Sequence, residues 1–158
     1  MRILALDLAT KTGYAMNEPD VSGTEDFSLR RGDSPGIRYL RFVSWLEEII
    51  AKSRPDIVVA EQAHHRGGAA TEVAAGFQTH MQSTCAKHGV EFTTRHTGTI
   101  KKHATGKGNA GKDEMMAAFV QKWGREPKDD NHADAMWLLD MVSREFNGQE
   151  GSPPAAAG

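Results

Sequence analysis

Five short segments of alternating or continuous apolar residues predict β-strands. The opening segment is followed by the turn-like sequence ATKTG and a second apolar stretch, so the chain is predicted to begin with a hairpin. The fourth segment, DIVVA, is apolar on both faces, which is typical of a buried central strand. The five segments are residues 2–7, 13–16, 23–29, 56–60 and 90–94.

Longer segments repeat their apolar residues every three or four positions and predict helices. In the first of these, Leu40, Val43, Leu46 and Ile50 have this spacing, and Pro55 ends the pattern. The predicted helices cover residues 37–52, 69–88, a short piece within 97–112, 113–123, and the stretch from Asp129 or Asp130 to about Phe146. This order predicts an α/β domain over residues 1–147 with a five-stranded mixed sheet flanked by helices. Residues 148–158 carry no large apolar side chain and are predicted to form a disordered tail.

Composition narrows the functional classes only modestly. A chain of 158 residues with 39% hydrophobic residues can bury a core without disulfides. Cys85 is the only cysteine, so an internal disulfide and a cysteine-based zinc site are both excluded, and a reducing cytoplasmic setting is expected. The first apolar run is interrupted by Asp7, which disfavours a signal peptide, and no run approaches the roughly 18 apolar residues of a membrane span.

The distribution of charge is more informative than its sum. A net charge of −2 argues weakly against nucleic acid as a partner. Residues 92–112, however, contain no acid, and their basic side chains are Arg95, Lys101, Lys102, Lys107 and Lys112. This stripe is either a solvated surface with a chance run of one sign or a binding surface for phosphates.

Two carboxylates stand in strands that are otherwise apolar. Asp7 ends the first strand, and Glu61 directly follows the fourth. Burying an ionised carboxylate costs on the order of several kcal/mol unless a cation or hydrogen bonds compensate for it. Each acid could alternatively cap a loop or pair with an arginine, and ends of central strands are also where ligands and catalytic groups collect.

A third acidic feature begins the last predicted helix. Asp130 and Asp134 are four residues apart and therefore share one helical face, with Asn131 nearly on the same side. Asp129 or Asp130 could simply be an N-cap. Asp134 lies among apolar residues and, if it faces inward, needs a cation. Together the three acidic positions offer the oxygen ligands that Mg²⁺ and Mn²⁺ prefer, and two such ions could activate a water for phosphodiester hydrolysis.

These segments resemble the RuvC-type resolvases of the RNase H-like superfamily, in the compact form found in phages and bacteria. The matching segments extend in order from Met1 to about Phe146, and they are ILALDLATKTGYA, IVVAEQ, KKHATGKGNAGKDEM and DDNHADAMWLL. The resemblance implies an RNase H-like fold, a homodimer in which helix 69–88 meets its partner, and paired incisions across a four-way DNA junction. It also implies two Mg²⁺ or Mn²⁺ ions in each active site.

Position by position, the resemblance implies roles for particular side chains. Asp7 resembles the acid that bridges both metals, Glu61 the acid that closes the fourth strand, and Asp134 the acid of the last helix. Lys112 matches a lysine near the scissile phosphate, and Lys102 and Lys107 match further DNA-contacting positions. Lys101, in the same basic stripe, is included in the predicted DNA surface.

The sequence departs from the family pattern at two places. Where many relatives carry an acid or a histidine three residues before the final aspartate, this chain has Asn131, so the fourth metal ligand is predicted to be Asp130, with Asn131 next and His132 least favoured. Where some relatives use an aromatic wedge after the Glu61 position, this chain offers residues that could stack on bases or simply form a polar loop. They are His64, His65 and Arg66.

Three other functions remain open from the sequence. A nuclease of the same fold could act on a flap, a fork or an RNA intermediate, because loops and dimer geometry select the substrate. A non-catalytic nucleic-acid-binding module would not need the acids at all three positions. An ATP-binding domain of the related actin and sugar-kinase superfold usually needs a second domain, which 158 residues do not supply.

Overall fold

A single five-stranded mixed sheet forms the centre of the protein, for which a computed structural model describes residues 1–63 and 67–150. The strands are β1 (Ile3–Asp7), β2 (Lys11–Asn17), β3 (Asp20–Asp26), β4 (Ile57–Glu61) and β5 (Glu91–Arg95). They are arranged in the order β3-β2-β1-β4-β5. The first three strands form an antiparallel meander, whereas β4 and β5 join β1 in parallel. This architecture confirms the predicted α/β fold class.

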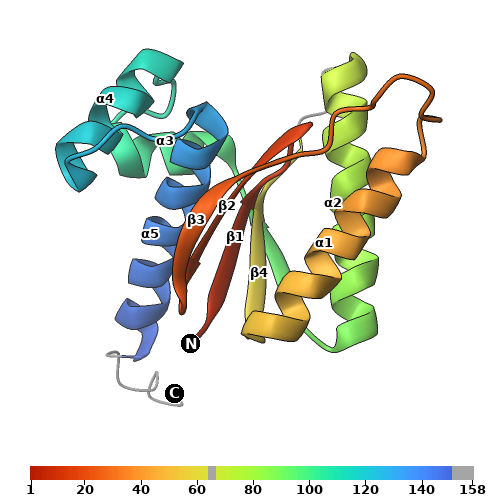
Figure 1. The fold of residues 1–158 in the computed structure, drawn as a ribbon. Helices are drawn as coiled ribbons and strands as arrows, with labels where there is room; N and C mark the ends of the chain where they lie inside the picture. Colours follow the sequence, from red (N-terminus) through yellow and green to blue (C-terminus); the bar gives the residue numbers. More distant parts are fainter. Residues whose placement is uncertain (64–66, 151–158) are drawn as a thin grey trace.

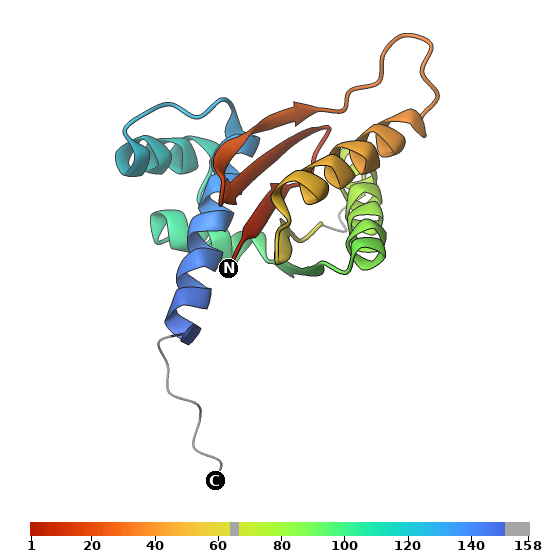
Figure 2. The ribbon, with the colours of Figure 1, turned by 60° about the horizontal axis from the view of Figure 1, so that its bottom comes forward.

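Helices cover both faces of the sheet. They are α1 (Ile37–Ser53), α2 (Ala69–His88), α3 (Thr97–Thr105), α4 (Lys112–Trp123) and α5 (Asp130–Glu150). Figure 1 shows α1 and α2 on one side of the sheet and α3, α4 and α5 on the other, and Figure 2 shows the same three layers after rotation. No helix in the described part of the chain combines the length and the hydrophobicity that would let it cross a bilayer.

The alternation of side chains along β1 divides the core between the two faces. Leu4, Leu6 and Leu8 pack with the residues of α1 and α2. Ile3 and Ala5 belong to a second cluster, with the residues of α3, α4 and α5. Because side chains two positions apart share a face of the sheet, Asp7 continues the second series and lies on the α5 side.

The third strand begins and ends earlier than the predicted 23–29. The hairpin turn is formed by Glu18 and Pro19, since Asn17 pairs with Asp20 in the register of β2 and β3. Phe27, which was expected within the strand, leaves the ladder: its N–H donates to the carbonyl of Thr10 at 2.8 Å and its ring is buried in the core. The prediction failed because a polar edge strand needs few apolar residues, so its start gave no alternating pattern.

The last helix extends beyond the predicted end at Phe146. The α5 helix continues to Glu150, so residues 148–150 are helical where a disordered tail was expected. The sequence has no helix-breaking proline until Pro153, which explains why the helix does not end with its apolar stripe. Residues 151–158, the remainder of the expected tail, lie outside the described part of the chain.

Candidate active site

Two of the predicted acids lie at the ends of neighbouring parallel strands. Asp7 is the last residue of β1 and Glu61 the last residue of β4, and the two strands pair in parallel from Ile3 and Ile57 onward. In both strands the residues that share a face with the acid belong to the core cluster beneath α5. Both carboxylates therefore lie on the same side of the sheet, at its carboxyl-terminal edge.

The third acid comes from the first turns of α5. This helix begins at Asp130 and packs against β1 and β2. Gly13 allows this close approach, because a Cβ atom at that position would lie 1.9 Å from the backbone oxygen of Asn131. Carboxylate oxygens of Asp7, Glu61 and Asp134 consequently lie within 4.8 Å of one another. We refer to these three residues as the carboxylate cluster.

Burial and mutual repulsion make this cluster electrostatically unfavourable when it is fully ionised. The pKa of Asp7 is raised well above its usual range, first by burial and then by repulsion from Glu61 and Asp134. Burial and the same neighbouring charges raise the pKa of Asp134 to about 7. Lys101 and Lys112 oppose this rise by attraction, but not enough to cancel it. A divalent cation would supply the missing positive charge.

Asp130 lies beside the carboxylate cluster but outside it. Its Oδ2 atom accepts from Lys112 Nζ at 3.1 Å, and this contact raises the pKa of the lysine. Asp130 still contributes to the raised pKa values of Asp7 and Asp134, so its charge acts on the site. Lys112 is the first residue of α4, immediately after Gly111 and one position before the predicted start of this helix.

Thr97 is a contact of the site that the sequence analysis missed. Its hydroxyl donates to Glu61 Oε1 across a span of 36 residues. Thr97 begins α3, directly after β5, which is the parallel neighbour of β4. The position of Thr97 beyond the end of a parallel strand was a usable signal, because all such ends meet at one edge of the sheet.

Hollows adjoin the carboxylate cluster on two sides. One has a volume of about 230 Å³, includes Asp7 and Glu61, and is otherwise lined mainly by small side chains near the start of α2. The other, of about 160 Å³, includes Glu61 and Asp134 together with Lys101 and Lys112. The carboxylates are therefore accessible from a surface that also carries lysines.

His132 is turned away from the cluster, consistent with its low rank as a ligand. Its Nδ1 atom accepts from the backbone N–H of Lys128 at 3.0 Å, which leaves the proton on Nε2 to donate to Ser22 Oγ at 2.8 Å. The ring is 1% exposed, and burial lowers its pKa. His132 thus joins the start of α5 to β3.

The basic stripe of residues 92–112 divides into two groups. Arg95 forms a bidentate ion pair with Glu145 at 2.7 and 3.2 Å, and His103 contacts Asp140 at 2.7 Å, so both side chains attach neighbouring elements to α5. Lys102 and Lys107 are exposed, and Lys107 pairs with Glu114 at 3.1 Å. The predicted contacts His64, His65 and Arg66 lie outside the described residues.

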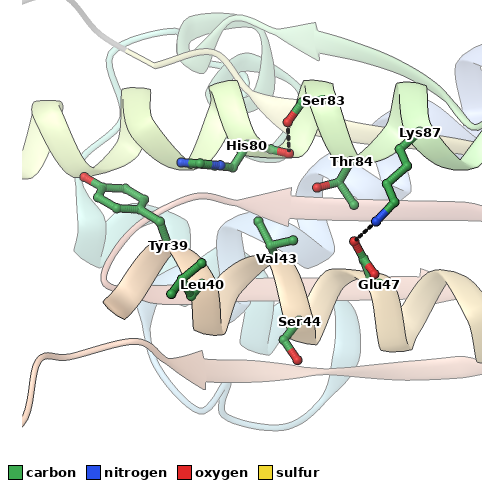
Figure 3. Close-up of a pocket in the computed structure, with 9 residues that line it drawn as sticks. All are labelled: Tyr39, Leu40, Val43, Ser44, Glu47, His80, Ser83, Thr84 and Lys87. Atoms are coloured by element: carbon green, nitrogen blue, oxygen red, sulfur yellow. Dashed lines mark hydrogen bonds and ion pairs between the residues drawn. The ribbon is translucent and has the colours of Figure 1, made fainter. Parts of the chain in front are cut away.

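In helix 69–88, for which the resemblance implies a partner contact, two large apolar side chains pack within the protein. Phe77 and Met81 are completely buried, and Phe77 stacks on Phe42 of α1. The outer side of α2 instead borders a groove of about 530 Å³, which we call the α1–α2 groove (Figure 3). Its lining residues are Tyr39, Leu40, Val43, Ser44, Glu47, His80, Ser83, Thr84 and Lys87.

Comparison with solved structures identifies the fold. RuvC from Thermus thermophilus in complex with a Holliday junction substrate matches with a TM-score of 0.73 and 17% identity, over 96% of each chain. The chain has the RuvC fold. A second structure of RuvC from Thermus thermophilus matches with a TM-score of 0.70 and 17% identity, over 96% of this chain and 97% of that one.

A eukaryotic protein has the same RuvC fold. A yeast mitochondrial Holliday junction resolvase matches with a TM-score of 0.56 and 14% identity, over 94% of this chain and 84% of its own. No protein-family model matches the chain. A search of curated proteins also finds no match. At these identities the comparisons confirm the predicted RNase H-like architecture, and the chemistry has to be argued from the site.

Proposed function

We propose that this protein is a metal-dependent endonuclease that resolves four-way DNA junctions by paired, symmetric nicks. The observation that carries this proposal is the carboxylate cluster, formed at the carboxyl-terminal edge of the sheet by residues from three distant parts of the chain. The RuvC fold adds a substrate class, since one matching structure is a complex with a Holliday junction.

The donor set suits Mg²⁺ or Mn²⁺. All three side chains of the cluster offer carboxylate oxygens, and the raised pKa values of Asp7 and Asp134 mean that a cation would relieve repulsion that the protein alone does not neutralise. Asp7, Glu61 and Asp134 would hold the metal, and Asp130 remains our predicted fourth ligand, with its present partner Lys112 close by. Two bound ions would supply an activated water and stabilise the leaving oxygen of the phosphodiester.

The surrounding residues have distinct tasks in this proposal. Thr97 orients the Glu61 carboxylate through its hydroxyl hydrogen bond. Lys112 is 83% exposed, so it can exchange Asp130 for a phosphate oxygen of the substrate and neutralise charge there. Lys101, which shares a hollow with Glu61 and Asp134, attracts the same strand, while Lys102 and Lys107 bind the backbone farther from the cut.

The symmetric cut requires two copies of the site. We propose a two-fold homodimer through the outer side of α2, as predicted for helix 69–88. The inner side of that helix is occupied by its own core, so the contact would use the α1–α2 groove and the 68% exposed side chain of Leu40. Two-fold symmetry would then present two active sites to a junction of matching symmetry.

Cleavage of a labelled synthetic four-way junction tests the proposal. The wild type should produce paired nicks with Mg²⁺ or Mn²⁺ and none with chelator, while linear duplex stays intact. Asp7→Asn should retain junction binding and lose cleavage by at least about a hundredfold, since it removes charge from the metal ligands. Glu126→Gln, which changes an exposed carboxylate, is the matched control and should cut normally.

Each other outcome has a definite meaning. Full cleavage by Asp7→Asn would disprove the site assignment. Metal-dependent cutting of a flap, a fork or an RNA–DNA hybrid in preference to the junction would retain the site and replace the substrate. Tight junction binding without cutting under any metal would identify a binding module.

A further inference from the structure

The connection between β3 and α1 projects from the body of the protein. Figures 1 and 2 both show the connection after Phe27, residues 28–36, which we call the β3–α1 arm, extending away from the sheet. In Figure 1 the arm lies near the start of α2, at the end of the sheet where β1 and β4 terminate. The arm is therefore at the same end of the molecule as the carboxylate cluster.

The arm and the first turns of α1 form a second basic segment, separate from residues 92–112. Arg30 and Arg31 are exposed on the arm, and Arg38 and Arg41 follow on α1. Asp33 is the only acid between residues 27 and 46, so the segment carries a clear positive excess in a chain whose net charge is −2. None of the function proposed above makes use of these arginines.

Asp33 orders the arm without cancelling its charge. Its carboxylate accepts from the backbone N–H of Arg30 and from the Arg41 guanidinium, each at 2.8 Å. The N–H of Asp33 in turn donates to the carbonyl of Arg30 at 3.0 Å, which closes a tight turn around Gly32. The charges of Asp33 and Arg41 thus offset each other, while Arg30 and Arg31 remain exposed on a preorganised turn.

The start of α1 adds to the positive potential. This 17-residue helix has neither an acidic residue in its first turn nor a side-chain cap at Gly36. No acidic side chain of the first turn therefore offsets the positive end of the helix dipole. Exposed arginines on an ordered turn beside such a helix end form a surface suited to a polyanion.

We propose that the β3–α1 arm is a second DNA-binding surface, on which Arg30 and Arg31 contact the backbone phosphates of a duplex arm of the substrate. The inference rests on the proposed function only for the identity of the polyanion. Figure 1 shows α3 and α4, which carry the lysines, on the opposite side of the sheet from α1, so the two basic surfaces approach the end of the sheet that holds the carboxylate cluster from different sides. A branched DNA could touch both while one strand enters the site, whereas a short single strand could not.

The salt dependence of DNA binding tests this surface. The double variant Arg30→Gln/Arg31→Gln, made in the non-cleaving Asp7→Asn protein, should bind a four-way junction more weakly, by about tenfold at moderate salt. The slope of log K against log salt should fall by about 1.8, because each lost contact with a duplex phosphate removes about 0.9. Lys52→Gln, at the far end of α1 in an exposed pair with Glu48, is the control and should leave the slope unchanged.

The readouts separate this inference from the proposed function. If the Asp7→Asn protein binds the junction and the double variant keeps the same salt slope, the arm is not a DNA surface, and the assignment of the active site is unaffected. If the Asp7→Asn protein binds no branched DNA, the proposed function itself is wrong. An equal loss of affinity for a short single strand would also overturn the inference, since the arm is assigned to duplex. When the double substitution is made in the protein that retains Asp7, it should raise KM and leave the single-turnover rate at saturating DNA unchanged.

Discussion

At the scale of single residues, Asp134 and Asp7 are acids whose surroundings oppose their ionisation. The folded protein holds both beside Glu61, where burial and like charge favour the protonated form. Such an arrangement costs stability in a protein without bound metal, and sites that cost stability are commonly functional. The cost itself is measurable, because it depends on pH.

We predict that the metal-free protein loses stability as pH rises. An acid whose pKa is higher in the folded than in the unfolded protein stabilises the fold when it is protonated. This contribution is fully present below the unfolded pKa, near 4, and it is lost as pH rises through the folded pKa, which is about 7 for Asp134. Asp134→Asn should therefore raise the melting temperature at pH 8 by several degrees, at about 2–4 °C per kcal/mol, and have less effect at pH 5. Thermal unfolding in chelator measures both.

Comparing Asp134→Asn with the wild type removes the opposing pH dependence that His132 contributes to stability. Burial lowers the pKa of His132, so this residue contributes stability that is lost as pH falls, and it does so equally in both proteins. Saturating Mg²⁺ should stabilise the wild type at pH 8 and have little effect on Asp134→Asn. A variant that is no more stable than the wild type at pH 8 in chelator would contradict the repulsion described for the cluster.

The acids of the site were predictable because each one violates its local pattern. Asp7, Glu61 and Asp134 interrupt apolar runs, and a single sequence displays that conflict directly. Thr97 and Gly13 interrupt nothing, and their importance depends on which elements meet in space. The ion pair between Lys112 and Asp130 likewise depends on the approach of α4 to α5.

At the scale of elements, the site depends on how closely α5 approaches β2. Gly13 pairs with Asp7 across the β1–β2 ladder, and the backbone of Asn131 occupies the space where a side chain at residue 13 would lie. A methyl group there must displace the start of α5, whose first two turns carry Asp130 and Asp134. The position of these two acids, our predicted metal ligands, is thus set by the absence of a side chain at residue 13.

We predict that Gly13→Ala destabilises the protein by about 3 kcal/mol, because the neighbouring atoms are backbone and cannot move aside as a side chain could. Urea unfolding measures this loss. Metal-dependent cleavage by the folded fraction should also fall, since Asp134 moves relative to Asp7.

Gly148→Ala is the matched control on the same helix. An added Cβ at residue 148 meets nothing within 4 Å, so this substitution should be neutral or stabilising by up to about 1 kcal/mol. Equal effects of the two substitutions would show that close approach of β2 and α5 is not what residue 13 provides.

Elements with a strong period were predicted well, and weakly patterned ones were not. The α1 helix was expected at 37–52 and covers Ile37–Ser53, whereas the polar strand β3 was displaced by three residues. A strand at the edge of a sheet needs one paired side and few apolar contacts, so its limits are set by the turn before it. The short α3 helix lacked a long period, and the contact of His103 with Asp140 at 2.7 Å attaches it to α5.

At the scale of the whole molecule, paired cutting requires that two sites act during one encounter with DNA. In the proposed function, a monomer with its single carboxylate cluster would make one nick in each encounter. The α1–α2 groove is bordered by the exposed Leu40 of α1, and the ion pair of Lys87 and Glu47 at 3.2 Å joins the two helices across it (Figure 3). Such a surface, with an exposed apolar side chain beside charged ones, suits a dimer contact.

We predict that Leu40→Glu weakens dimerisation by about 1–2 kcal/mol, roughly tenfold, because a charge replaces an apolar contact at the centre of the interface. Sedimentation velocity over a range of protein concentrations measures the change. Val21→Glu, at a 45% exposed apolar residue on β3, is the control and should dimerise normally.

The product of a cruciform plasmid then connects assembly to function. Two cuts made before the protein dissociates from the plasmid give linear DNA, whereas a single cut leaves a nicked circle. Leu40→Glu should shift the product toward nicked circles at concentrations where the wild type gives linear DNA, and higher protein concentration should restore linear product because the cluster itself is intact. A monomeric wild type that still linearises the plasmid would show that paired cutting needs no dimer, and a dimeric Leu40→Glu would place the interface on another face of the protein.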